Sequence, residues 1–413
     1  MDRINIGIVG CGHITAAHLN GFKELSGHGL LEDVTIKALC DRERWKADSF
    51  VQKGVGPEQQ KGVGPEGDPM QAPPVWVSEF QEASPEVYSD AAEMYAKAGI
   101  DTVWLCTSVH THHSLGLAAI EAGMHLLIEK PIALTVKAGL KLVEAARRKG
   151  VTVGVAECVR YLPEARIAHW AFDQGYLGRP QFSLYAAMGG YWAPDKIVAG
   201  TSWRHSKMMA AGGVSVDWMV HFFHYLRYVM GEVEAVNGIP LVTEPTRVIR
   251  NANGTILNQV RNEVDDTLTC SIQYENGAAG SVLVSWAGHG TEVNVPPIFY
   301  GSKGSIDGDQ IVIDGRVPQP MWEFFQENAE PNTKEQFFPR GITNGFTLEI
   351  LDFLNALKTG GQMETSGEQG VRDLSCCFSV LEAALQGRTM PVHEVYSQKA
   401  ASYEKNINEN WNI

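Results

Sequence analysis

The sequence lacks the features that mark secreted, membrane-bound or nucleic-acid-binding proteins. No apolar stretch approaches the roughly 20 residues that a membrane-spanning helix needs. The chain starts directly with the strand-like segment INIGIVG, without the basic and apolar regions of a signal peptide. Lys and Arg number 34 against 48 Asp and Glu, and the formal net charge of −14 disfavours nucleic acid and anionic membranes as partners. We therefore expect a cytoplasmic protein.

Cysteine is scarce, and its placement argues against a disulfide framework. The chain has seven cysteines in 413 residues, and no C-x-x-C pair occurs among them. An odd number without framework spacing is typical of reduced thiols. Because a single core stops growing at roughly 250 to 300 residues, a chain of this length is expected to form two domains.

The first 156 residues have the pattern of a doubly wound parallel sheet of Rossmann type. Short β-branched or apolar runs alternate with longer helical patterns, which predicts an α/β architecture with crossover helices. The expected strands are Ile4–Val9, Thr35–Cys40, Asp101–Thr107, His125–Glu129 and Val151–Ala156.

A stretch rich in Pro and Gly, residues 53–86, interrupts this rhythm. It contains the hexapeptide KGVGPE twice, at Lys53–Glu58 and Lys61–Glu66. So short a tandem copy cannot bury a core of its own, so we expect a surface insertion. A mobile loop is preferred here over a lid or a subunit contact.

Residues 157–396 have a different pattern, typical of an α+β domain. In LTCSIQY, Leu268, Cys270, Ile272 and Tyr274 share one face of a strand. Asn276-Gly277 then predicts a tight hairpin. We expect an open, mainly antiparallel sheet with helices on one side, followed by a polar, peripheral tail at 397–413.

The segment GIVGCGHITAAH follows the first expected strand and opens into a helix. Gly10 and Gly12 let the backbone approach a pyrophosphate, and the helix start at His13 and Ile14 offers N–H groups to its negative charge. Thr15 stands in place of the third glycine of G-x-G-x-x-G, so the packing of helix on strand must accommodate a side chain.

Asp41 ends the second expected strand, in ALCDR. Its carboxylate can accept hydrogen bonds from the adenosine ribose hydroxyls and repels a 2′-phosphate, so NAD is the predicted cofactor. Arg42 beside it can offset that repulsion, which leaves NADP open as an alternative.

Five segments occur in the order of a known family pattern. They are GCGHITAAH at Gly10–His18, TSVHTH at Thr107–His112, AGMHLLIEKP at Ala122–Pro131, Trp203-Arg204, and AAGGVSVDWMVH at Ala210–His221. Together they resemble the Gfo/Idh/MocA oxidoreductases, named for glucose–fructose oxidoreductase and inositol dehydrogenase, although Ser108 and Val109 replace the usual Pro-Asn. The resemblance implies hydride transfer between NAD(P) and a secondary hydroxyl of a sugar, sugar derivative or cyclitol. It also implies a homo-oligomer, a dimer or tetramer, assembled through the open sheet.

Oxidation of an alcohol needs a base and a cation at the same oxygen. Lys130 follows an apolar run at the carboxyl end of an expected parallel strand, where ligands of such sheets bind, and can supply the cation. By the resemblance, Lys130 contacts both cofactor and substrate, and Glu129 binds the nicotinamide ribose or holds Lys130. The further cofactor-binding residues that we predict are Thr107, Ser108, His112, Trp203 and Arg204.

Asp217 and His221 lie four residues apart, so on a helix they share one face. Histidine is suited to accept the alcohol proton, and an aspartate can orient the substrate or the imidazole. By the resemblance, His221 is the proton acceptor, which makes Lys130, Asp217 and His221 the predicted catalytic residues.

The predicted substrate-binding residues are Lys130, Arg160, Tyr191, Trp192, Asp217 and His221. Aromatic faces suit the C–H surface of a pyranose or cyclitol, and core packing of these aromatics is an equal alternative. His224, and the run His110–His113, invite a metal-site interpretation. Because ligands on one helix seldom complete such a site, hydrogen bonding is preferred and no metal is predicted.

Two other functions stay open at this point. A glycosidase that uses NAD for transient oxidation and elimination would release an aglycone without net redox change. A non-catalytic sugar- or dinucleotide-binding protein would keep the fold without turnover, although the presence of Lys130, Asp217 and His221 argues against it.

Overall fold

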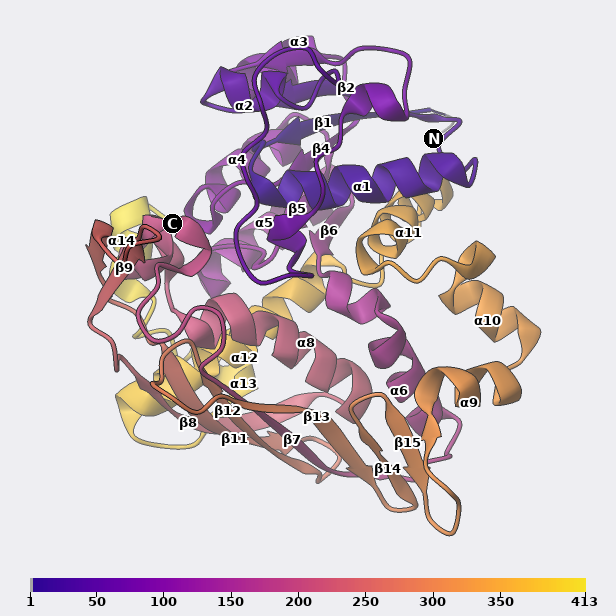
Figure 1. Ribbon diagram of the computed structural model, residues 1–413, viewed down its shortest axis with the longest axis vertical. Coiled ribbons are helices and arrows are strands. Elements are labelled where there is room, and N and C mark those ends of the chain that lie inside the picture. The colour runs from indigo at the N-terminus through magenta and orange to yellow at the C-terminus, as the bar shows by residue number, and fades with distance from the viewer. Residues whose placement is uncertain (1–2) are drawn as a thin grey trace. The chain divides into compact units, whose positions relative to one another are not determined.

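The computed structural model describes residues 3–413, which form two compact units (Figure 1). The first unit comprises the chain up to Leu134, Ala138–Cys158 and Ile342–Gly370, and the second comprises Thr135–Lys137, Val159–Gly341 and Val371–Ile413. The segment 342–370 thus packs with the first unit, although the sequence pattern places it with the second half. Of the helices in the described residues, none combines the length and apolar character that crossing a bilayer requires.

A six-stranded sheet with strand order β3-β2-β1-β4-β5-β6 forms the centre of the first unit. Every neighbouring pair is parallel, which confirms the predicted Rossmann-type sheet. The sequence pattern does not indicate β3, because it is only three residues long. The strands are β1 (Ile4–Val9), β2 (Val34–Cys40), β3 (Glu86–Tyr88), β4 (Thr102–Leu105), β5 (His125–Glu129) and β6 (Val153–Ala156).

Helices cover both faces of this sheet. On one face, the ring of Trp104 in β4 packs against Phe22 and Phe353, at centroid distances of 5.3 and 5.1 Å. On the other face, the helix that contains Gly116 packs closely on the sheet, because a Cβ added to Gly116 would lie only 3.2 Å from the side chain of Leu126 in β5. Because both faces are covered, the central strands β1, β4, β5 and β6 are almost entirely buried. The helices of this unit are α1 (His13–Gly27), α2 (Arg44–Asp48), α3 (Ala91–Lys97), α4 (Val109–Glu121), α5 (Val136–Lys149, which starts in the second unit) and α11 (Gly345–Thr359).

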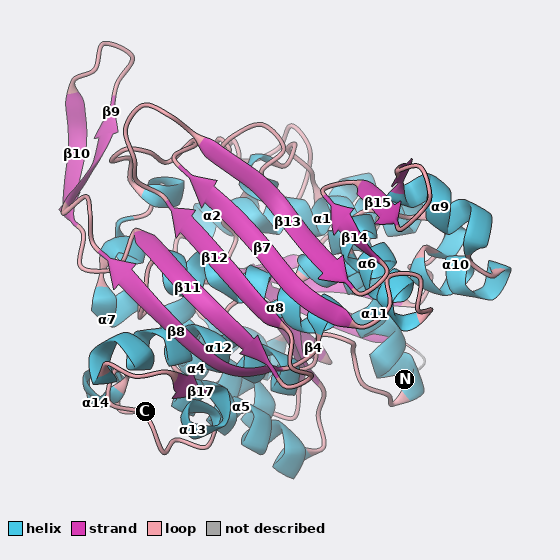
Figure 2. Ribbon diagram, turned by 90° about the horizontal axis from the view of Figure 1, so that it is seen from below, coloured by secondary structure: helices cyan, strands magenta, loops and turns pink. Residues whose placement is uncertain are grey.

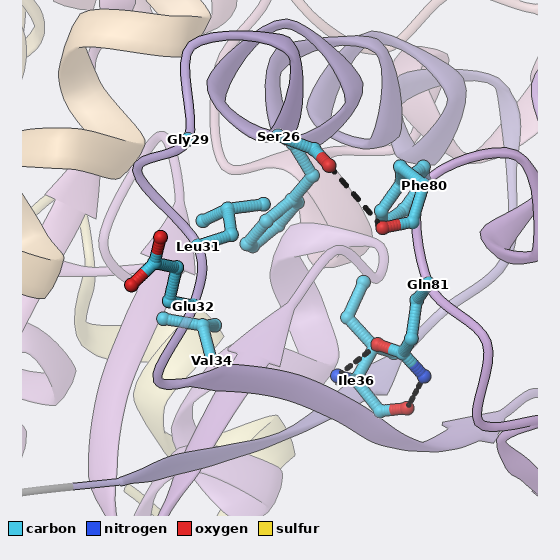
Figure 3. A pocket seen from close by; sticks show the side chains of 9 residues that line it. Ser26, Gly29, Leu31, Glu32, Val34, Ile36, Phe80 and Gln81 are labelled. Atoms are coloured by element: carbon cyan, nitrogen blue, oxygen red, sulfur yellow. Dashed lines mark hydrogen bonds between the residues drawn. The ribbon is translucent and has the colours of Figure 1, made fainter.

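The insertion at 53–86 is attached to α1 and β2. The side-chain amide of Asn20 in α1 donates to the carbonyl oxygen of Pro73 at 2.8 Å. The side chain of Gln81 accepts from the N–H of Ile36 at 2.8 Å and donates to its carbonyl at 3.0 Å. Figure 3 shows this pair of bonds beside a cavity of about 290 Å³. These bonds tie the segment to regular elements, and its mobility stays a prediction.

The second unit contains a nine-stranded sheet with strand order β16-β15-β14-β13-β7-β12-β11-β8-β17. Only the pair β7 and β12 is parallel among its described strands, which confirms the predicted open, mainly antiparallel sheet. Buried and exposed residues alternate along β11 as expected, and Gly277 has the positive φ of 84° that the hairpin requires. The strands are β7 (Pro180–Met188), β8 (Val233–Leu241), β11 (Thr267–Tyr274), β12 (Ala279–Ser285), β13 (Val293–Gly301), β14 (Gly304–Asp307), β15 (Gln310–Ile313), β16 (Gln319–Pro320) and β17 (Met390–Pro391).

Figure 2 looks onto the open face of this sheet, with the helices of the unit behind it. A separate hairpin of β9 (Thr246–Arg250) and β10 (Ile256–Arg261) stands beside it. The helices are α6 (Pro163–Asp173), α7 (Lys207–Ala210), α8 (Met219–Met230), α9 (Met321–Asn328), α10 (Pro331–Phe337), α12 (Gly367–Gln386, which starts in the first unit), α13 (Val392–Tyr396) and α14 (Lys405–Trp411).

The C-terminal tail is docked by buried contacts. Glu404 accepts a hydrogen bond from the N–H of Val136 at 2.9 Å, and Asn408 accepts one from the hydroxyl of Thr135 at 2.7 Å. Ile407 between them is fully buried. The polar composition of the tail predicts a peripheral position, whereas its few apolar and acidic side chains hold it in place.

Candidate functional site

The loop after β1 leaves room for a phosphate. Gly10 has a φ of 90°, and a Cβ there would lie 2.5 Å from the carbonyl oxygen of Cys106, so only glycine fits. Gly12 precedes α1, and a Cβ on it would meet no atom within 4 Å. Among the described residues no side chain caps the first turn of α1, which starts at His13. Space and uncapped N–H groups are what a pyrophosphate needs at a helix start.

Two polar side chains hold this loop in shape. Thr15, the departure from the third glycine, is fully buried and donates from its hydroxyl to the carbonyl of Gly10 at 2.8 Å. The carboxylate of Asp41, just after β2, accepts from the N–H of Cys11 at 2.9 Å. Thr15 therefore joins helix to loop, and Asp41 is fixed beside the glycine loop with Arg42 exposed next to it.

His112 connects the loops that follow β4 and β5. Its Nδ1 lies 2.9 Å from the carbonyl oxygen of Pro131, and its Nε2 lies 3.0 Å from that of Thr107. Both carbonyl oxygens can only accept, so the ring donates to them, and burial lowers the pKa of His112 although these two bonds act in the other direction. These contacts give His112 a positioning role, and its contact with a cofactor, like that of Ser108 at the start of α4, stays a prediction.

Lys130 lies at the end of β5, half-buried, with a cis peptide bond to Pro131. Glu129 before it is buried, accepts from the N–H of Lys130 at 3.1 Å, and lies 2.8 Å from Nε2 of His18. Burial raises the pKa of Glu129, but the hydrogen bond and charge of His18, together with the charge of Lys130, bring it below its ordinary value. An ionised Glu129 thus fixes the backbone that carries Lys130.

Behind this pair lies Glu349 of α11, a residue that sequence reasoning missed. It is fully buried, its carboxylate lies 3.9 Å from Nδ1 of His18, and neither of its oxygens has a hydrogen-bond partner among the described residues. Burial, followed by the negative charges of Glu129 and Glu157, raises the pKa of Glu349 well above its ordinary value. His18 belongs to the glycine-loop segment that the sequence singled out. Glu349 is one glutamate in a helical pattern, and nothing in that pattern indicates that it is buried.

Replacement of Glu349 by glutamine should remove a pH-dependent loss of stability. A carboxyl whose pKa is raised in the folded state contributes stability that is full below its ordinary pKa and is lost as pH rises through the raised value. Between about pH 5 and about pH 8, wild-type protein should therefore lose about 1 kcal/mol or more relative to Glu349→Gln. Thermal unfolding at the two pH values measures this difference. The exposed Glu32→Gln is the control, and parallel pH dependence in wild type and Glu349→Gln would contradict the prediction.

In the second unit, Asp217 and His221 do not share one regular helix. Asp217 lies in the π-helical turn η6 (Val214–Trp218), and His221 lies in α8, which follows at once. A Cβ on Gly213 would lie 1.7 Å from the carbonyl oxygen of Asp265, so only glycine allows the chain to pass this close to Asp265. The sequence spacing predicts a uniform helix, whereas this close approach reshapes its first turn.

The carboxylate of Asp265 anchors the π-helical turn. It accepts from the N–H of Gly213 at 3.0 Å and from the N–H and hydroxyl of Ser215, both at 2.7 Å. Asp265 lies 48 residues after Asp217 in the chain and has no pattern of its own, so sequence reasoning missed it.

Trp203 and Arg204 lie beside Asp217. Nε of Arg204 donates to the Asp217 carboxylate at 3.0 Å, and its guanidinium carbon lies 4.4 Å from the ring centroid of Trp203. The structure thus brings together two predicted cofactor-binding residues and one predicted catalytic residue, all within the second unit.

His224 belongs to a buried ionic network. Its Nδ1 lies 2.7 Å from the carboxylate of Asp373, which also pairs with Arg227, and Arg227 continues to Glu232 at 2.8 Å. Burial raises the pKa of Asp373, but the charges of His224 and Arg227 hold it below its ordinary value. Among residues 3–413, no three His, Cys, Asp or Glu side chains are grouped to hold a metal.

The predicted substrate-binding aromatics are partly exposed. Tyr191 is 45% exposed and meets Trp192 edge to face at 4.8 Å, and Lys196 lies 4.2 Å above the Tyr191 ring. The guanidinium carbon of Arg160 lies 4.0 Å from the ring centroid of Tyr228. Core packing therefore does not account for Tyr191, and the role of these residues toward a substrate stays a prediction.

Two family models cover most of the chain. The model described as "Oxidoreductase family, NAD-binding Rossmann fold" matches residues 4–157, and the one described as "Oxidoreductase family, C-terminal alpha/beta domain" matches residues 171–392. Both matches agree with the two sheets described above.

Individual relatives cover similar lengths. A levoglucosan dehydrogenase of Pseudarthrobacter phenanthrenivorans is 28% identical over 76% of this chain and 89% of its own length. A myo-inositol 2-dehydrogenase of Thermotoga maritima is 21% identical over 95% and 99%. A solved structure of levoglucosan dehydrogenase in complex with NADH and L-sorbose has a TM-score of 0.73 at 22% identity, covering 96% of this chain and 100% of that one, which shows a shared fold. With both family models matched, the chain belongs to the Gfo/Idh/MocA oxidoreductases and carries their NAD-binding Rossmann domain.

Proposed function

We propose that the protein is an NAD-dependent dehydrogenase or reductase that acts on a secondary hydroxyl of a sugar, sugar derivative or cyclitol. The observation that carries the proposal is the family membership together with relatives named for the oxidation of levoglucosan and myo-inositol. The position of Asp41 favours NAD over NADP, because its carboxylate, held beside the glycine loop, would repel a 2′-phosphate.

We assign the chemistry of the chain to three side chains. The nicotinamide of NAD, when bound, takes up or donates the hydride. The ammonium of Lys130 stabilises negative charge on the reacting oxygen, and the imidazole of His221 accepts the hydroxyl proton. Asp217, paired with Arg204, orients the substrate hydroxyl or the imidazole. Arg160, Tyr191 and Trp192 would contact the ring of the substrate.

A panel of polyols tests the proposal. Purified protein is mixed with NAD and, in turn, levoglucosan, myo-inositol, a pentose and a hexose, and the absorbance of reduced nicotinamide is followed. We expect turnover with at least one of them. Release of an aglycone from a glycoside without net NADH would instead favour the glycosidase, and binding without turnover on the whole panel would favour a binding protein.

We also propose that copies of the chain assemble through the open face of the nine-stranded sheet. Large apolar side chains on this face are 38% to 56% exposed, and they are Phe182, Ile239, Leu241 and Tyr300. An aspartate in place of Ile239 would put a charge in such an interface, so Ile239→Asp should shift the mass measured by light scattering from oligomer to monomer. Val317→Asp, 86% exposed in a loop, is the control. An oligomer unaffected by Ile239→Asp would speak against this face.

A further inference from the structure

The insertion closes a cavity over the glycine loop of the first unit. The cavity has a volume of about 550 Å³. Cys11, Gly12 and His13 form one wall, and insertion residues 58–62 and 70–74 form much of the other. Cys11 and Gly12 belong to the segment that faces a pyrophosphate in the proposed function. The insertion therefore lies next to the loop that would hold the cofactor phosphates rather than on a remote surface.

Two close contacts hold the backbone of the insertion in this place. Nε2 of His13 lies 3.0 Å from the carbonyl oxygen of Lys61, which sets Lys61 over the first residue of α1. A Cβ on Gly62 would lie 2.8 Å from Cα of Gln71, so glycine permits the close approach of the two insertion segments. These contacts fix the backbone from which the Lys61 side chain starts.

The two copies of KGVGPE place their lysines differently. The ammonium of Lys53, in the first copy, lies 3.3 Å from the carboxylate of Glu79 and 5.5 Å from the ring centroid of Trp76. Lys61, in the second copy, lines the cavity. The same residue in the same hexapeptide thus has a carboxylate partner in one copy and lines the cavity beside the glycine loop in the other.

We propose that Lys61 is a further cofactor-binding residue, which contacts the pyrophosphate of NAD from the insertion side. The start of α1 offers N–H groups and a partial positive charge, and a lysine ammonium adds a full charge that suits a phosphate. Glu58 also lines the cavity, and its negative charge would repel a phosphate there unless a cation such as Lys61 balanced it. The inference rests on the proposed use of NAD, and it does not depend on which polyol is oxidised.

Binding of NADH in the absence of substrate tests this role. Lys61→Met is compared with Lys53→Met, the same substitution in the other copy, by fluorescence titration and stopped-flow release. Loss of one charge-assisted phosphate contact should raise the Kd of Lys61→Met roughly tenfold, mainly through faster release, and leave Lys53→Met within about twofold of wild type. The Kd of Lys61→Met for ADP-ribose, which contains the same pyrophosphate, should rise by the same factor.

The outcomes separate this inference from the proposed function. Equal Kd values for Lys61→Met and Lys53→Met would overturn the role of Lys61. A loss of affinity for NADH without a loss of affinity for ADP-ribose would overturn it as well. Lys61→Gln provides a second variant, and thermal unfolding shows that each variant is folded. If wild-type protein binds NADH but oxidises no polyol, the dehydrogenase proposal fails and this one stands. If wild-type protein binds no NADH, both fail.

Discussion

Lys130→Met is expected to lower kcat by about a hundredfold to a thousandfold on any polyol that the wild type oxidises. Removal of one preorganised donor to a developing oxyanion has an effect of this size. Methionine keeps the apolar stem of the lysine and removes only the ammonium. Because Glu129 fixes this backbone through the N–H of Lys130, at 3.1 Å, the loop should keep its conformation in the variant.

Steady-state kinetics and NADH titration measure the two roles that the resemblance assigns to Lys130. The Kd for NADH should rise far less than kcat falls, since the glycine loop is unchanged. Lys97→Met removes an exposed lysine of the same unit, paired with Glu93 at 2.8 Å, and should be silent. If Lys130→Met kept more than about a tenth of the wild-type kcat, the cation at the reacting oxygen would have to be another group.

His221→Asn should lower kcat by about a hundredfold to ten-thousandfold, the range that a general base contributes. His221 and His224 lie on the same helix, so His224→Asn is the matched comparison.

His224→Asn should lower the stability of the protein and leave kcat nearly unchanged. It removes a ring that lies 2.7 Å from the buried carboxylate of Asp373 and leaves the network around Arg227 incomplete. A loss of about 1–3 kcal/mol in stability follows, with turnover per folded molecule nearly unchanged. Thermal unfolding and kinetics of the two variants are compared. If His221→Asn lowered the unfolding temperature and His224→Asn lowered kcat instead, the roles assigned to the two histidines would have to be exchanged.

The elements that local patterns could reveal are those whose signals lie within a few residues. β1 and β5 are found at their predicted bounds, because a buried parallel strand is a continuous apolar run. The hairpin at Gly277 follows from the positive φ that this one glycine adopts. The glycine loop, Lys130 and the Trp203-Arg204 pair could be recognised because each is part of a short contiguous motif.

Polar contacts between distant segments were beyond such patterns. His18 and Glu129 are 111 residues apart in the chain, and Glu349 joins them from a helix that belongs to the first unit. Asp265 shapes the turn that carries Asp217, and the carbonyl of Lys61 meets His13 from inside the insertion, whose repeated hexapeptide gives no sign of this contact. Hydrophobic periodicity shows which side of an element faces a core, because the apolar residues on that side are the ones that become buried. Which carboxylate meets which N–H depends on where the folded chain places both, and only the tertiary structure contains that information.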